Sequence, residues 1–152
     1  MEVVENTLDV ALDELLERPL FCFLATTDDG APRVSPLWFL WADRAVWIVG
    51  DRSKTYPARI EADPRTALAV VDFEPETGTV QHVGMRGRAS VEPHDPARAE
   101  QVLAKYLGPD RAEWDREFFG DPAEWGDEMV MLRFVPETVV AREQSYRPPD
   151  GE

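Results

Sequence analysis

Lysine, cysteine and histidine are scarce in this chain of 152 residues, which holds two lysines, one cysteine and two histidines. The single cysteine, Cys22, excludes an intramolecular disulfide and agrees with a reducing compartment. Because it lies in the apolar stretch FCFLAT, we interpret it as a small buried side chain. A mononuclear metal site needs about three protein ligands, so His82 and His94, with no clustered cysteine, predict no metal site.

The sequence also lacks an apolar run long enough to cross a bilayer, and its start, MEVVENTLDV, lacks the features of a signal peptide. We therefore expect a cytoplasmic protein. No repeat, low-complexity tract or Gly/Ser-rich linker divides the sequence, so residues 1–152 are expected to form a single domain. The signatures of Ser-His-Asp hydrolases, P-loops and dinucleotide-binding loops are absent, and no catalytic side chain is predicted.

Positive charge is scarce overall, because the net charge is -14. Nucleic acids and anionic membranes need cations to neutralise their phosphates, so neither is an expected partner. The charge is unevenly distributed: residues 31–91 hold eight basic and seven acidic side chains, whereas the rest of the chain holds eight basic and 23 acidic ones. An anionic ligand is therefore expected to bind in the middle of the chain.

Apolar runs separated by turn residues predict about six strands. The expected strands span residues 21–27, 31–41, 45–50, 66–73, 79–91 and 129–141. Pro32 and Pro36 each remove a ladder donor, which predicts a bulge or an edge position for the second strand. This order lacks the regular strand-helix alternation of a parallel sheet. We expect a mainly β fold, an antiparallel closed or split β-barrel with flanking helices.

Helices are predicted at three places. Asn6 or Thr7 can cap a first helix that ends at Pro19, and a short second helix follows residue 55. A third helix is expected over residues 95–107, with Asp95 as its N-cap and Gly108 as its stop. Residues 109–128 carry four large aromatic side chains among many carboxylates and predict an irregular or short-helical segment, which could cover a ligand mouth or a dimer groove.

Three cations surround one predicted helix start in the stretch VGDRSKTYPARIEADPR, residues 49–65. A helix N-terminus attracts anions, and Ser53 or Thr55 is suited to the N-cap position, so the junction with Lys54 is similar to a phosphate cradle. The alternative is that Arg52 and Lys54 line an exposed loop and that the hydroxyl is an ordinary cap. The residues alone leave both readings open.

The order of short motifs extends this observation. The strands APRVSPLWFLW and AVWIVG, the loop DRSK, the helix end EADPR, and the strands TALAVVDF and GMRGRASVEP follow one another over residues 20–92. In this order they resemble the pyridoxamine 5'-phosphate oxidase-like family of FMN- and F420-binding split β-barrels. The resemblance implies an antiparallel split β-barrel of the FMN-binding type, working as a homodimer with the cofactor at the subunit interface.

The resemblance also implies where a cofactor would lie. Arg33 and the pair Ser53-Lys54 match the positions that hold the flavin phosphate, whereas two strand segments match those along the isoalloxazine ring and the ribityl chain. His82 falls near a position where relatives place a flavin-contacting Gln, and Trp38 could stack on a flat ring. The cofactor-binding residues expected on this basis are Arg33, Val34, Ser35, Pro36, Leu37, Trp38, Ile48, Val49, Gly50, Ser53, Lys54, Thr55 and His82.

Two departures from the family pattern argue against true pyridoxamine phosphate oxidase activity. The second basic residue of the phosphate clamp is replaced by Trp38, and the C-terminal stretch REQSYRPPDGE is not rich in arginine. The expected function is an FMN-dependent oxidoreductase acting on an unidentified small molecule. An F420-dependent reductase is the alternative, disfavoured because the acidic surface would repel the polyglutamate tail of F420. A haem-binding or non-catalytic ligand-binding module, with His82 as haem ligand, is the third possibility.

Overall fold

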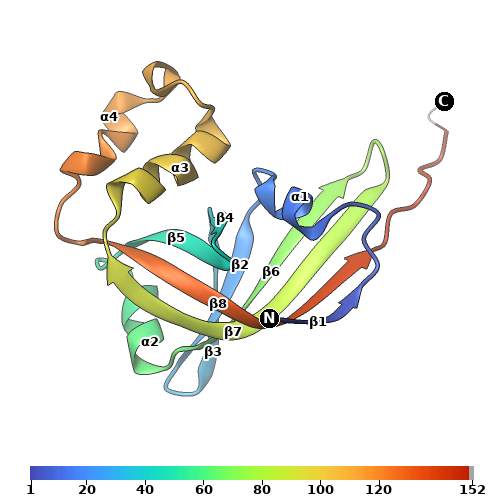
Figure 1. Ribbon diagram of the computed structural model, residues 1–152, viewed down its shortest axis with the longest axis horizontal. Helices are drawn as coiled ribbons and strands as arrows, with labels where there is room; N and C mark the ends of the chain where they lie inside the picture. The colour runs from blue at the N-terminus through green and yellow to red at the C-terminus, as the bar shows by residue number, and fades with distance from the viewer. Residues whose placement is uncertain (151–152) are drawn as a thin grey trace.

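Figure 1 shows the computed structural model of the chain, which describes residues 1–150. Its strands are β1 (Glu2–Asn6), β2 (Cys22–Asp28), β3 (Ala31–Leu37), β4 (Leu40–Ala42), β5 (Ala45–Asp51), β6 (Arg65–Glu74), β7 (Thr79–Pro93) and β8 (Met129–Glu143). Its helices are α1 (Leu12–Glu17), α2 (Tyr56–Ala62), α3 (Pro96–Leu107) and α4 (Arg116–Phe119), with the 3-10 turns η1 (Arg111–Glu113) and η2 (Pro122–Glu124). Among these described residues no helix is long and apolar enough to span a membrane.

The strands form one eight-stranded sheet in the order β3-β2-β6-β7-β8-β5-β4, with β1 added beside β8. All pairs are antiparallel except β1 with β8. The two ends of this order, β3 and β4, are consecutive in the chain, so the sheet curls around a single core. This arrangement confirms the predicted mainly β fold, a split β-barrel. The core side chains include Phe39, Ile48, Val70, Met85 and Phe134.

The β2–β3 hairpin follows from its turn residues. Asp29 and Gly30 both have positive φ, 50° and 83°, which suits the right-handed twist of a tight hairpin. Strand β3 pairs with β2 and lies at one end of the sheet order. On its other side no strand of the described residues needs the backbone N–H groups that Pro32 and Pro36 lack. The expected edge position of this proline-containing strand is confirmed.

The expected strand over residues 31–41 is wrong as a single element. It breaks at Trp38 and Phe39, because β3 pairs with β2 whereas β4 pairs with β5 on the far end of the sheet order. At the break the Phe39 N–H donates to the Tyr106 hydroxyl of α3, at 3.0 Å, in place of a ladder partner. A chain that changes partners in this way must turn, so the single strand predicted for 31–41 ends there.

The first helix is also shorter than predicted. Residues Glu2–Asn6 form β1, which pairs with β8, and helix α1 begins only at Leu12. Asn6 caps no helix; its side-chain oxygen accepts the Leu8 N–H at 3.1 Å, and the Thr7 N–H donates to the Ala141 carbonyl at 3.0 Å. The edge of β8 offers these residues ladder hydrogen bonds that helical periodicity alone does not reveal.

Helix α3 confirms its predicted boundaries. The Asp95 carboxylate accepts the Arg98 N–H at 3.1 Å, and Gly108 ends the helix with a φ of 101°. Its last turn is tied to the barrel by Lys105, whose ammonium donates to the carbonyls of Leu16 and Phe39, both at 2.9 Å. Tyr106 adds a hydroxyl bond to the Leu20 carbonyl at 2.6 Å.

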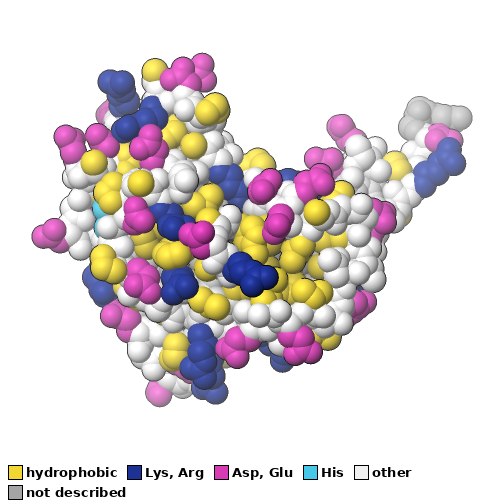
Figure 2. Space-filling view, viewed as in Figure 1, with side chains coloured by type: hydrophobic (Ala, Val, Ile, Leu, Met, Phe, Trp, Pro, Cys, Tyr) yellow, Lys and Arg dark blue, Asp and Glu magenta, His cyan; other side chains and the backbone are white. Residues whose placement is uncertain are grey.

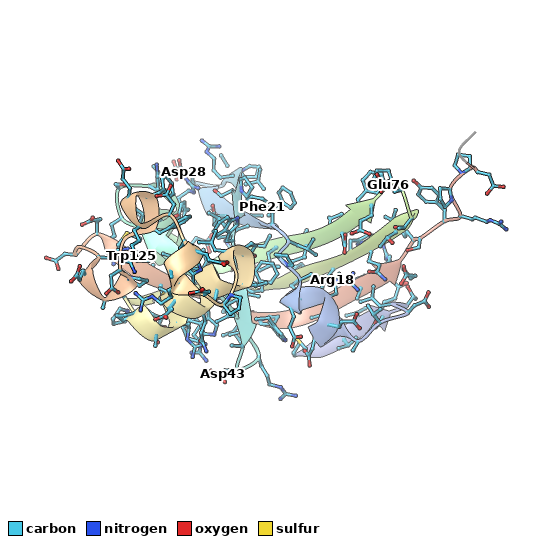
Figure 3. All side chains as sticks on the ribbon, turned by 90° about the horizontal axis from the view of Figure 1, so that it is seen from above. Arg18, Phe21, Asp28, Asp43, Glu76 and Trp125 are labelled. Atoms are coloured by element: carbon cyan, nitrogen blue, oxygen red, sulfur yellow. The ribbon has the colours of Figure 1, made fainter. Side chains whose placement is uncertain are left out.

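Residues 109–128 form the short-helical segment that was expected. Each of its three short elements begins at an aspartate, Asp110, Asp115 or Asp121, whose carboxylate accepts backbone N–H groups. Part of the acidity of this segment is thus explained by capping. Figures 1 and 3 show α3 and α4 side by side at one end of the molecule, with Trp125 there and Glu76 of the β6–β7 turn at the other end.

Candidate functional site

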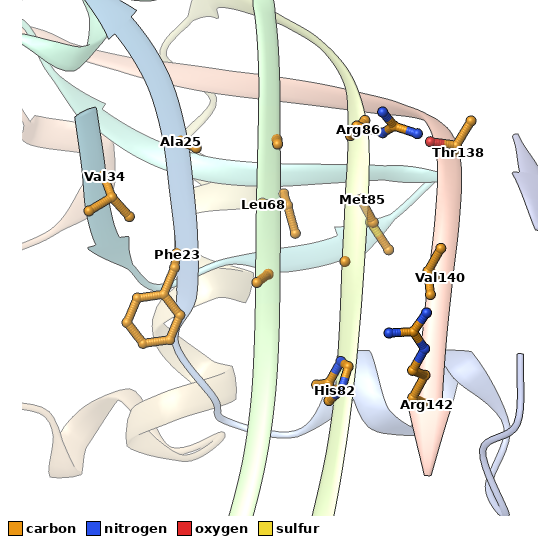
Figure 4. A pocket seen from close by; sticks show the side chains of 13 residues that line it. Phe23, Ala25, Val34, Leu68, His82, Met85, Arg86, Thr138, Val140 and Arg142 are labelled. Carbon is orange, nitrogen blue, oxygen red and sulfur yellow. The ribbon is translucent and has the colours of Figure 1, made fainter. Parts of the chain in front are cut away.

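A groove crosses the outer face of the sheet, and Figure 4 shows the larger of its two cavities. It consists of two cavities of about 610 and 490 Å³ that share Ala25, Ala67, Arg86 and Thr138. The groove is hollow because side chains on neighbouring strands are small where they face outward: Ala25 pairs with Ala67, and Ala69 pairs with Gly84. A methyl group added to Gly84 would meet nothing within 4 Å.

The two walls of the groove differ in chemistry. Phe23 and Val34 stand on the side of β2 and β3, whereas His82, Arg86 and Arg142 stand on the side of β7 and β8, as Figure 4 shows. Alternation along each strand places these side chains outward, away from the core. Arg142 forms an ion pair with Glu5 at 3.0 Å, whereas Arg86 forms none among residues 1–150. An apolar floor with Arg86 on one wall can accept a flat ligand that carries negative charge.

Large apolar side chains surround the groove without being covered. Val34 is 67% exposed, Val71 42% and Phe73 56%. On the face seen in Figure 2, hydrophobic side chains likewise gather across the middle of the molecule, with most acidic side chains around them. An apolar face of this kind marks a binding surface in soluble proteins.

Arg33, Lys54 and Arg59 are called here the cationic corner, and none of them lines either cavity of the groove. Arg33 stands directly opposite Thr26 in the β2–β3 ladder, and the Arg59 Nε donates to the Thr26 hydroxyl at 2.9 Å. Thr26 also lines the second cavity, but it is only 3% exposed and its side chain alternates with the outward-facing Ala25, so Arg33 and Arg59 approach it from the other face of the sheet. Among residues 1–150, Lys54 and Arg59 form no ion pair, whereas Arg33 lies 3.7 Å from the Asp28 carboxylate.

The loop before α2 differs from the expected capping arrangement. Thr55 occupies the N-cap position, but neither its hydroxyl nor that of Ser53 caps the helix. Thr55 instead accepts a hydrogen bond from Arg59, and the Ser53 N–H donates to Asp51 at 2.8 Å. Hydrogen bonds from Ser53, with the nearby charge of Lys54, lower the pKa of Asp51. The hydroxyl of Thr55 thus positions Arg59 at the corner.

Comparison with known proteins identifies the family. Residues 8–139 match the family model described as pyridoxamine 5'-phosphate oxidase. The chain belongs to this family. Similar solved structures include an F420 reductase, 24% identical with a TM-score of 0.64 over 87% of this chain and 98% of the reductase. An FAD-binding protein from Mesorhizobium loti is 22% identical, with a TM-score of 0.63 over 90% of this chain and 96% of that protein.

A third structure of the oxidase-like fold is the FAD and heme binding protein from Mycobacterium smegmatis, 15% identical, with a TM-score of 0.69 over 92% of this chain and 73% of that one. At identities of 15–24%, the similarity to these three structures shows a shared fold and no more. Among curated proteins, the trigger factor of Trichormus variabilis is 45% identical over 42 residues, and the match covers 28% of this chain and 9% of trigger factor. A match over so little of trigger factor carries no argument about function.

The predicted residues of this oxidase-family chain separate into three groups in the structure. Arg33 and Lys54 are at the corner, and Val34 and His82 line the groove. Ile48 and Gly50 point into the core, and a methyl group on Gly50 would lie 2.9 Å from a Val130 methyl, so these two residues could contact a cofactor only through their backbone. The remaining residues, Ser35, Pro36, Leu37, Val49, Ser53 and Thr55, lie on the same strands or in the loop before α2.

Trp38 does not line the groove. Its ring stacks on Tyr106 of α3, with centroids 4.4 Å apart and an interplanar angle of 5°, and on Phe119 at 6.3 Å. No residue of the 109–128 segment lines the groove either. This segment therefore packs on Trp38 at the end of the barrel and does not cover the groove.

Of the groove lining, sequence reasoning found only Val34 and His82; the polar residues it missed include Thr26, Arg86 and Arg142. A signal for Arg86 was present, because positions 82, 84, 86 and 88 share one face of a strand. Nothing local indicates that Thr26 receives a bond from Arg59 of a later helix. Within residues 1–150, no group of three His, Cys, Asp or Glu side chains is placed to hold a metal ion.

Proposed function

We propose that this chain is an FMN-binding oxidoreductase that acts as a homodimer on a small molecule. The observation that carries the proposal is an apolar groove whose lining residue Thr26 is bound, from the other face of the sheet, by Arg59 of a cationic corner, in a chain of net charge -14. A phosphate needs several strong donors, and Arg33, Lys54 and Arg59 supply charged donors of this kind. The residues present therefore fit a phosphate-bearing cofactor.

The groove suits the flat ring of a flavin. Its small floor residues, Ala25, Ala67 and Ala69, leave room for a ring system, and His82 and Arg86 offer donors along one edge. Bound flavin would supply hydride or electron transfer, while the chain anchors the phosphate, orients the ring and excludes water. No side chain of the groove is assigned as a general acid or base.

A second copy of the chain would close the groove. Phe23, Val34, Val71 and Phe73 expose apolar area on one face of the sheet, and two-fold association would bury that face against itself. This arrangement would place the cofactor between subunits. It supports the homodimer that the family resemblance implies.

Two other cofactors remain candidates on specific observations. The fold is similar to that of an F420 reductase over 87% of the chain, although the acidic surface would repel an acidic tail. Haem is favoured by His82, a potential axial ligand in a groove large enough for a macrocycle.

Titration of the purified protein with FMN, F420 and haem, followed by absorption spectroscopy, tests the proposal. The matched variants are Lys54→Ala and Arg52→Ala: both remove one cation, but Arg52 is paired with Glu61 at 2.8 Å. Loss of a charged hydrogen bond costs about 1.5–3 kcal/mol, so Lys54→Ala should weaken FMN binding roughly 10- to 100-fold, and Arg52→Ala less than about 3-fold.

The alternatives predict different spectra. A haem Soret band that His82→Ala abolishes, with no flavin binding, would replace FMN by haem. Binding of F420 in preference to FMN would change the cofactor and keep the corner. Equal FMN affinity of Lys54→Ala and wild type would refute the assigned phosphate site.

A further inference from the structure

A separate cavity of about 350 Å³ lies between the 109–128 segment and the adjoining ends of β5 and β8. Its lining residues are Asp51, Phe118, Phe119, Trp125, Gly126, Glu128 and Met129. It shares no lining residue with the groove. This aromatic cavity therefore needs its own explanation.

Three aromatic rings form its walls, and two of them are held in place. The Trp125 indole N–H donates to the Phe119 carbonyl at 2.6 Å, and the Trp125 ring stacks on His94. Phe119 stacks on Trp38 and meets Phe118 edge-on, with centroids 4.8 Å apart. The rings thus stand in fixed positions without filling the cavity.

Phe118 lines the cavity, yet it is 78% exposed. The Phe118 ring therefore remains in contact with water in the isolated chain. Its hydrophobic area is available to a ligand that enters the cavity.

Two carboxylates complete the lining, Asp51 and Glu128. Neither forms an ion pair among residues 1–150, and the neighbouring Arg52 is directed to Glu61. The Glu128 carboxylate lies against Gly126, where an added methyl group would stand 2.6 Å from the Glu128 Oε2. Gly126 therefore leaves the space that the carboxylate occupies at the cavity.

Aromatic faces attract cations, and carboxylates add a full opposite charge. We propose that the aromatic cavity binds a small organic cation of the alkylammonium class. No residue of the groove or of the cationic corner lines the cavity, although the charge of Lys54 acts on Asp51, so the variants that test the proposal change Glu128 and leave Asp51 in place.

Choline and its neutral isostere 3,3-dimethyl-1-butanol are suitable probes, titrated into the cofactor-free protein and followed by calorimetry and by broadening of the ligand methyl signal in NMR spectra. Choline should bind about 2- to 30-fold more tightly than the neutral analogue, since cation–π contacts contribute about 0.5–2 kcal/mol. Equal binding of the two probes, or no binding of choline at millimolar concentration, would overturn the proposal.

Variants locate the site. Glu128→Gln removes charge at constant shape, and Phe118→Leu removes an exposed ring with little risk to the fold; each should weaken choline binding about 2- to 5-fold. Gly126→Ala should do the same by displacing the Glu128 carboxylate. The control, Glu124→Gln, removes a carboxylate of the same segment outside the lining and should leave affinity unchanged. If Glu128→Gln and Phe118→Leu bind choline like wild type, the cation does not bind in this cavity.

Discussion

Gly87 and Gly84 lie on the same strand, β7, and should respond in opposite ways to the same substitution. A methyl group on Gly87 would stand 2.1 Å from the Val135 carbonyl oxygen and 2.9 Å from the Pro136 Cα. Both contacts are with backbone of β8, which cannot rotate away. At this point the β7–β8 register also shifts, so the strands are already irregular.

The expected cost of Gly87→Ala can be worked from these contacts. Relieving the overlap requires β7 and β8 to separate by about 1 Å, an overpacking that costs roughly 1–3 kcal/mol. One or two ladder hydrogen bonds would weaken, at about 1 kcal/mol each. The lower flexibility of alanine in the unfolded chain returns about 0.5–1 kcal/mol. The net loss is about 1–4.5 kcal/mol, which lowers Tm by roughly 3–14 °C for a domain of this size.

Gly84→Ala is the control, because its methyl group would meet nothing within 4 Å. It should leave the free energy of unfolding unchanged or raise it by about 0.5–1 kcal/mol. Urea unfolding of the cofactor-free protein, followed by circular dichroism at two protein concentrations, measures both variants and separates effects on subunit association from effects on the chain. Equal stability of Gly87→Ala and wild type would refute the reasoning, as would an equal loss in both variants.

Two further predictions concern association and pH. Val71→Asp should convert the proposed dimer to monomer in light scattering, because it places a charge on the exposed sheet face, whereas Phe118→Asp should not; two unchanged masses would remove the face from the interface. Burial lowers the pKa of Lys105 from 10.5 to about 8. Between these pH values the unfolded chain holds a proton that the folded chain has released. The free energy of unfolding should therefore rise with pH across this range, by at most roughly 3 kcal/mol. Lys105→Met should abolish this rise, measured as the urea midpoint against pH in a Cys22→Ala background. That background is needed because burial raises the pKa of Cys22 to about 12, which makes stability fall with pH above pH 9. Equal slopes with and without Lys105 would contradict the assignment.

The elements that sequence patterns predicted well are those fixed by neighbouring residues. The β2–β3 hairpin follows from the Asp29-Gly30 turn, and α3 follows from Asp95 and Gly108 at its ends. Both signals are local and act within a few residues. The family resemblance, which rests on the order of such signals, is confirmed by the family match over residues 8–139.

The errors involve partners that are distant in the sequence. Residues Glu2–Asn6 form a strand because β8 supplies an edge more than 130 positions later, and the chain breaks at Trp38 because β3 and β4 have different partners. The candidate site divides in the same way. Lys54 could be found from its loop, whereas the groove exists only once Ala25, Ala67 and Gly84 are brought into register across three strands.

Strand β8 has a consequence for how the molecule is made. It is the last strand along the chain, yet β7 lies along one side of it, while β5 and β1 share the other. During synthesis these three strands emerge from the ribosome before the strand that pairs with them. The edge of each strand that faces β8 stays unpaired until residues 129–143 have been synthesised. Closure of the barrel is therefore a late, long-range step of folding.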